Sequence, residues 1–161
     1  MGILCPTPTP LAVRTLLSDL LGRAVEVHAL PKKQLTAKGA AAVAVYVGET
    51  GALAAVVATD LAVGGSLGAG LALLPARLVA EGESAGELSD DVMENLSEVF
   101  NVMTSVLNAE GRPRVTMDMV YRSSEPLPAP VATMLDGQMG QVPLGVNVPG
   151  YGSGNLAIVV R

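Results

Sequence analysis

Hydrophobic and polar positions separate most clearly in residues 89–108. Apolar side chains recur there every three or four positions, which at about 100° per residue aligns them in one stripe of an α-helix. The stripe consists of Val92, Leu96, Val99, Met103 and Val106. Asp90 and Asp91, near the start, complement the helix dipole. The pattern therefore predicts one long amphipathic helix whose apolar stripe faces the core.

The opposite side of this predicted helix is polar. Glu94, Glu98, Asn101 and Ser105 fall within roughly 60° of one another on the same helical wheel. Glu98 and Asn101 then lie one turn apart and point into solvent. Because asparagine has a poor propensity for helix interiors, Asn101 indicates a role other than helix stability.

Alternation and turn residues predict the other elements. Before the long helix these are a helix at 11–21 ended by Gly22, a strand at 24–30, an irregular segment at 31–39, and a hairpin of strands 41–48 and 52–59. A glycine-containing helix at 61–74 and an irregular segment at 80–86 follow. After the long helix we expect a strand at 114–121, a proline-rich segment at 123–130, and a hairpin of strands 141–149 and 155–161. Val115, Met117, Met119 and Tyr121 are expected on one side of their strand, and Pro143 near a sheet edge or a bulge.

The order helix, strand, irregular segment and hairpin occurs twice, at residues 11–59 and 89–161. We therefore expect an α/β (α+β) fold in which two duplicated units share one mainly antiparallel sheet with the helices packed on it. A chain of 161 residues suits a single domain, residues 1–161, in which residues 1–9 form a loosely ordered lead.

Composition narrows the classes of function. The chain has a net charge of −5, no Trp and one Phe, which opposes binding to nucleic acid. Cys5 is the only cysteine, so an intrachain disulfide is excluded and a reducing compartment fits best. Polar and glycine residues interrupt the apolar stretch 52–74, which argues against a membrane span. We expect a cytoplasmic protein with no metal site or cofactor of its own.

The pair Glu98-x-x-Asn101 on an exposed helix resembles the signature of the CheC/CheX family of chemotaxis phosphatases. The duplicated order of elements is also similar to the CheC-like fold. Matching residues 25–28 to 115–118 places Pro8 at the position of Glu98 and Leu11 at that of Asn101, so the first helix has no second pair. A single pair resembles the one-site CheX type, and flagellar switch proteins of similar fold lack the pair.

This resemblance implies that the chain dephosphorylates the phospho-aspartate of a CheY-type response regulator. Asn101 would orient the attacking water, and Glu98 would pair with a lysine of the receiver domain. Glu94 and Ser105 would contact the partner. Phe100 departs from the family pattern, which commonly has a small residue there; it either packs at the edge of the core or projects to the site, where it would contact the partner and tune access. The Mg²⁺ that this chemistry uses would belong to the receiver.

The resemblance also implies a homodimer, formed through the sheet edge near residues 143–148 or the matching edge of the first half. Two alternatives remain open at this point. In the first, the chain is a non-catalytic CheC-like module that binds a receiver or assembles with itself. In the second, it is an α/β domain in which Glu98 and Asn101 only make a helix surface polar.

Overall fold

The computed structural model describes residues 5–138 and 140–161. Its helices are α1 (Pro10–Leu21), α2 (Leu61–Leu71), α3 (Arg77–Ala85), α4 (Asp90–Val102) and α5 (Ala129–Asp136), with a 3₁₀ helix η1 (Met103–Leu107) directly after α4. Its strands are β1 (Glu26–Ala29), β2 (Ala42–Gly48), β3 (Leu53–Thr59), β4 (Val115–Arg122), β5 (Gln141–Val148) and β6 (Gly152–Val160). The six strands form one antiparallel sheet in the order β1-β5-β6-β3-β2-β4.

The sheet confirms the predicted duplication and shows that the two halves are interleaved. Exchanging β1 with β4, β2 with β5 and β3 with β6 reproduces the same strand order read backwards. The first strand of each half pairs with the hairpin of the other half: Val27 lies opposite Val146, and Met117 lies opposite Tyr46. An approximate twofold axis therefore passes between β3 and β6, where Ala58 faces Ala157.

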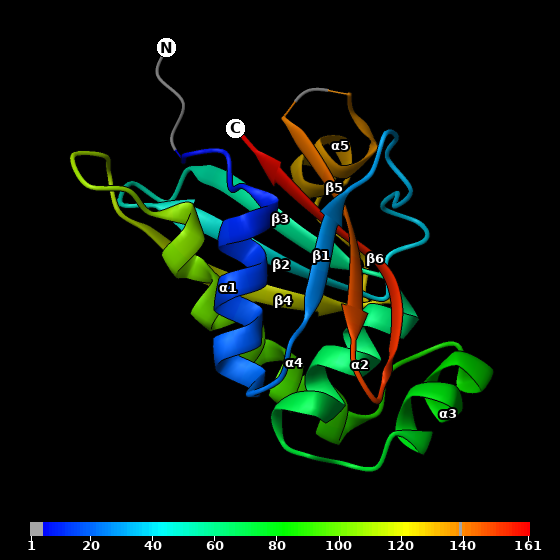
Figure 1. The fold of residues 1–161 in the computed structure, drawn as a ribbon. Helices are drawn as coiled ribbons and strands as arrows, with labels where there is room; N and C mark the ends of the chain where they lie inside the picture. The colour runs from blue at the N-terminus through cyan, green and yellow to red at the C-terminus, as the bar shows by residue number, and fades with distance from the viewer. Residues whose placement is uncertain (1–4, 139) are drawn as a thin grey trace.

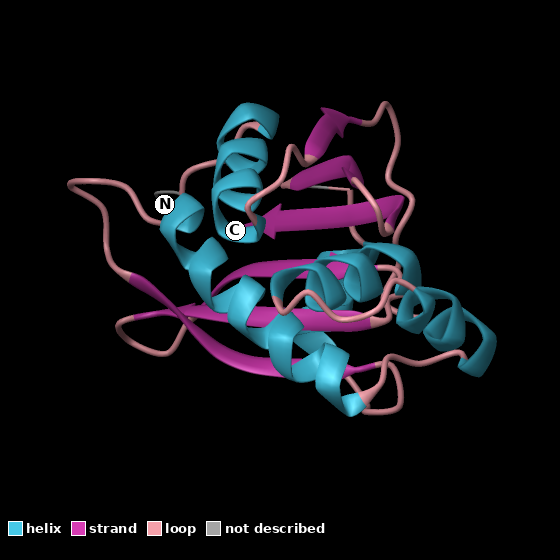
Figure 2. Ribbon diagram, turned by 60° about the horizontal axis from the view of Figure 1, so that its bottom comes forward, coloured by secondary structure: helices cyan, strands magenta, loops and turns pink. Residues whose placement is uncertain are grey.

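Helices cover both faces of the sheet (Figures 1 and 2). Alternate residues of each strand point to opposite faces, so one strand contributes to two cores. Tyr46 belongs to the larger core, under α1, α2 and α4, whereas its neighbour Val45 belongs to the smaller core under α5. Among the described residues, no helix is long and apolar enough to cross a membrane.

The long helix forms as predicted, with a change of pitch near its end. Ser89 caps α4 through a hydrogen bond from the amide of Val92, and the chain becomes 3₁₀ at Met103. Four residues of the predicted apolar stripe are buried, while Val106 is only partly covered. The first helix likewise ends at Gly22, whose φ of 69° is the left-handed conformation that glycine adopts readily.

Two predicted irregular segments contain helices. Residues 80–86 lie mostly within α3, which buries Val79 and Gly82 against its neighbours. α5 begins at Ala129 with a proline in its first turn and buries Val131 and Leu135. Neither helix shows a clear apolar period in the sequence, because each buries only two residues among polar residues or prolines.

The predicted alternation in β4 is wrong after Met117. Val45 pairs with Met119 and Tyr46 with Met117, so Asp118 is an extra residue in β4 and forms a bulge. Met119 therefore falls on the α5 face of the sheet and is 45% exposed.

Part of the expected lead packs against the domain where the structure describes it. Residues 1–4 lie outside the described part of the chain, but Cys5 is fully buried and its thiol approaches the carbonyl oxygen of Ala54. Burial raises the pKa of the Cys5 thiol, and the charge of Arg112 partly opposes this shift.

The two expected dimer edges are not free. β1 pairs with β5 along residues 144–147, and the amide of Leu30 donates to the carbonyl of Pro143, so Pro143 lies where this pairing ends. The matching strand β2 is covered by β4. The outer strands of the sheet are instead β1 and β4.

Candidate functional site

The acid–amide face, defined as Glu94, Glu98, Asn101 and Ser105, lies on the solvent side of α4 and η1. All four residues are exposed. Within the part of the chain that the structure describes, the side chains of Glu98 and Asn101 form no hydrogen bond or ion pair. A carboxylate and a carboxamide are therefore presented one helical turn apart, free to bind a partner.

A buried hydrogen bond holds the backbone beneath this face. The hydroxyl of Tyr46, on β2, donates to the carbonyl oxygen of Phe100 over 2.6 Å. Tyr46 is fully buried, and desolvation raises the pKa of its phenol, which keeps the hydroxyl protonated and able to donate. This bond fixes the residue that precedes Asn101 to the sheet.

The expected role of Phe100 at the site is wrong in this structure. Its side chain is 0% exposed and belongs to the core between α4 and the sheet. The ring therefore cannot border the acid–amide face or obstruct a partner. Its position on the wheel, at the edge of the apolar stripe, directs it inwards.

Close packing against α2 fixes the other side of α4. A Cβ atom built on Gly68 would lie 2.5 Å from the carbonyl oxygen of Val92, so only glycine permits this approach. Gly68 therefore serves the close packing of α2 against α4. The start of α4 is held as well, because Arg122 bonds Asp90 and the carbonyl of Leu88.

An apolar groove adjoins the acid–amide face. This α1/α4 groove has a volume of about 660 Å³ and is lined by Ala12, Thr15, Leu16, Asp19 and Leu20 of α1 and by Val102, Ser105 and Val106 beyond Asn101. Ser105 belongs to both the groove and the acid–amide face. Val102, one turn after Glu98, is 38% exposed.

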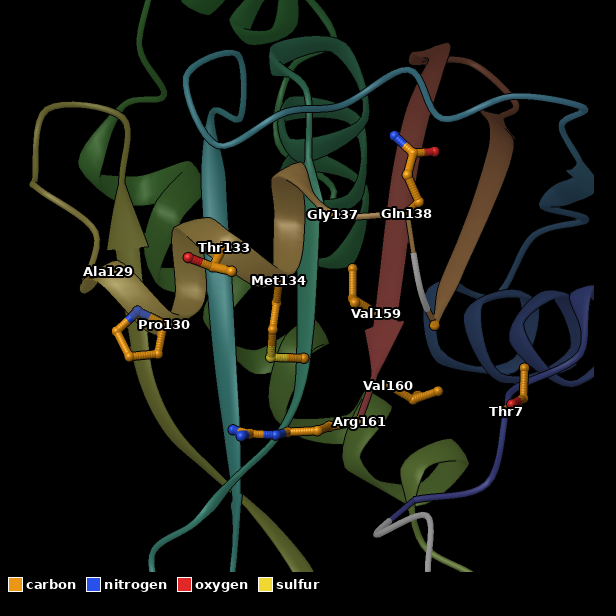
Figure 3. A pocket seen from close by; sticks show the side chains of 11 residues that line it. Thr7, Ala129, Pro130, Thr133, Met134, Gly137, Gln138, Val159, Val160 and Arg161 are labelled. Carbon is orange, nitrogen blue, oxygen red and sulfur yellow. The ribbon is translucent and has the colours of Figure 1, made fainter. Parts of the chain in front are cut away.

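A second cavity, of about 960 Å³, lies on the α5 side of the molecule. Figure 3 shows Pro130, Thr133 and Met134 of α5 facing Val159 and Arg161 at the end of the chain. Of the described residues that line it, Arg161 alone has an ionisable side chain, so these side chains offer no acid–base pair. In the described residues, no three His, Cys, Asp or Glu side chains are grouped as a metal site would require.

The first helix offers no equivalent pair. α1 contains neither glutamate nor asparagine, and Pro8, matched above to Glu98, is buried before the helix begins. Sequence reasoning placed Glu94, Glu98, Asn101 and Ser105 together, and the structure does the same. It missed Tyr46 and the groove, although a lone tyrosine in an Ala/Val strand is a signal for a buried hydroxyl.

Comparison with solved structures identifies the fold. No protein-family model and no curated protein sequence matches the chain. FliM in a FliM–SpeE complex from H. pylori superposes with a TM-score of 0.66 at 14% identity, over 94% of this chain and 81% of that one. The FliM middle domain from H. pylori gives 0.61 at 14% identity, over 94% and 84%.

A CheX–CheY–BeF3–Mg complex from Borrelia burgdorferi is also similar, with a TM-score of 0.51 at 13% identity over 92% of each chain. The chain therefore has the fold shared by CheC, CheX and FliM proteins, as the resemblance in the sequence predicted.

Proposed function

We propose that this chain accelerates the dephosphorylation of the phospho-aspartate of a CheY-type receiver domain, in chemotaxis or two-component signalling in the cytoplasm. The observation that carries the proposal is the exposed, unpartnered pair Glu98 and Asn101 on a helix fixed from within. The similarity to CheX, solved in complex with CheY, BeF3 and Mg, supports a partner of this class.

The proposed reaction requires few chemical groups from this chain. A phospho-aspartate is an acyl phosphate that hydrolyses unaided, so a helper need only position water and stabilise charge. The Asn101 carboxamide can accept from and donate to a water in line with the phosphoryl group. Glu98 pairs with a lysine of the receiver and fixes the docking, with Glu94 and Ser105 as further contacts. The receiver holds the Mg²⁺.

The test follows loss of phosphoryl group from phosphorylated receivers of the same genome, mixed with substoichiometric protein. We expect acceleration by wild type, its loss in Asn101→Ala with binding retained, and weaker binding in Glu98→Ala. Glu83→Ala is the matched control, because it removes an exposed acid from α3, away from the site. Acceleration that persists in Asn101→Ala would contradict the mechanism.

A second candidate function is a non-catalytic module that binds a receiver or assembles with itself. The higher TM-scores to FliM, 0.66 and 0.61 against 0.51 for CheX, favour it. Binding of a receiver by wild type without any acceleration would select this alternative.

Our proposal includes a homodimer through the outer side of β4, the longer of the two outer strands. Met119→Lys places a charge on this edge at a position that is 45% exposed in the monomer. We expect a dimeric mass for wild type and a monomeric mass for this variant by sedimentation. A monomeric wild type at high micromolar concentration would rule the dimer out.

A further inference from the structure

We propose that the α1/α4 groove receives an aliphatic side chain of the receiver domain, flanked on the receiver by lysine or arginine. The inference rests on the proposed function and names the partner chemistry that the same site selects. The groove would give the complex its affinity, whereas Asn101 acts on the phosphoryl group.

The groove adjoins the acid–amide face at the end of α4. Val102 lies one turn after Glu98 on α4, and Val106 of η1 lines the same groove. Ser105 lines the groove and is exposed beside Asn101. A partner that brings its phosphoryl group to Asn101 therefore reaches the groove with neighbouring residues.

The lining of the groove is apolar enough to bind an aliphatic group. Leu16 and Leu20 form the α1 wall, and Val102 and Val106 form the opposite wall. Leu16, Leu20 and Val106 are only partly covered within the chain. Covering these side chains with an aliphatic group of a partner would remove their apolar surface from water, which favours binding.

Charge specifies the flanks of that partner. Among the described residues that line the groove, Asp19 alone is charged, and the acid–amide face beside the groove adds Glu98. α4 and η1 contain no basic residue, and Arg14, the only basic residue of α1, does not line the groove. The charge on the described lining is therefore acidic, which favours a basic rim on the occupant.

The same charges disfavour a second copy of this chain. A symmetric contact through the groove would enclose Asp19 of both copies in one interface, with Glu98 of both copies beside it. Like charges at an interface weaken association, and the chain as a whole carries a net charge of −5. The basic partner is the occupant that the groove fits.

The test measures binding without hydrolysis, using CheY-type receivers of the same genome activated with beryllofluoride and Mg²⁺. Val102→Lys and Asp19→Lys alter opposite walls of the groove. Both positions are exposed, and lysine suits a helix, particularly near the C-terminus of α4. Leu73→Lys is the control, because Leu73 is 72% exposed and lies outside the groove.

We expect each groove variant to raise Kd at least tenfold and the control to stay within twofold, with all variants keeping the wild-type melting temperature. Wild-type affinity in both groove variants would overturn the inference while leaving the proposed function intact, since that function is read from phosphoryl loss in Asn101→Ala. Failure of wild type to bind any receiver would overturn both. Loss of self-association in Val102→Lys with unchanged receiver binding would assign the groove to a second copy.

Discussion

The hydroxyl of Tyr46 and the carbonyl oxygen of Phe100 are joined by a buried hydrogen bond of 2.6 Å. Phe100 lies in the last turn of α4, where carbonyl groups begin to lose their partners within the helix. The tyrosine satisfies one of them from the sheet. The position of Asn101 therefore depends on a strand more than fifty residues earlier in the chain.

Tyr46→Phe should lower the free energy of unfolding by about 1–3 kcal/mol, because the Phe100 carbonyl would remain buried without its donor. Tyr121→Phe is the matched control, since Tyr121 is only partly buried. Denaturant unfolding of both variants measures the difference. Equal losses in the two variants would show that the buried bond contributes nothing specific.

Tyr46 should also contribute to alkaline unfolding. Burial raises the pKa of Tyr46 above its ordinary value of 10.0, so above that pH the unfolded chain loses this proton before the folded chain does. The contribution of Tyr46 to the free energy of unfolding is fully present below pH 10. Above that pH it decreases by about 1.4 kcal/mol per pH unit. The unfolding free energy of Tyr46→Phe should fall less steeply than that of wild type between pH 10 and 11.

Gly68→Ala should destabilise the protein by about 1–3 kcal/mol, because the added methyl group would press on the backbone of Val92. Gly65→Ala on the same helix is the control. Its added Cβ would meet Val79 at 3.4 Å, an ordinary contact, and alanine is the better helix former. Thermal melting should separate the two variants, and a stable Gly68→Ala protein would mean that α2 and α4 are less closely held.

Phe100→Ala and Asn101→Ala should have opposite consequences although the residues are adjacent. The first empties a fully buried site and should cost about 3–5 kcal/mol of unfolding free energy. The second removes an exposed side chain without partners and should change stability by less than about 0.5 kcal/mol. Chemical denaturation of both variants tests this division between core and face.

The elements that the sequence predicted correctly are those in which hydrophobic and polar residues alternate with a strong periodicity. Residues 89–108 show an unbroken apolar stripe, and the exposed positions of Glu98 and Asn101 follow from it by geometry alone. The two hairpins carry alternation and turn residues together. Because both hairpins could be predicted, the repeated order of elements could be recognised in the sequence.

The parts that did not follow depend on contacts between distant segments. The bulge at Asp118 exists only in the pairing of β4 with β2, so the local alternation of β4 could not reveal it. α3 and α5 each bury only two residues, too few to set a period. The groove beside Asn101 arises where α1 meets η1, and no spacing within either segment predicts it.

Interleaving of the two halves has a consequence for how the chain acquires its structure. During synthesis, β1 emerges long before β5. Val27 of β1 can pair in the sheet only after Val146 of β5 has been synthesised. Pairing strands that are so far apart in the sequence slows folding. The sheet can therefore be completed only after β5 and β6 have left the ribosome, and neither half is expected to be a stable product by itself.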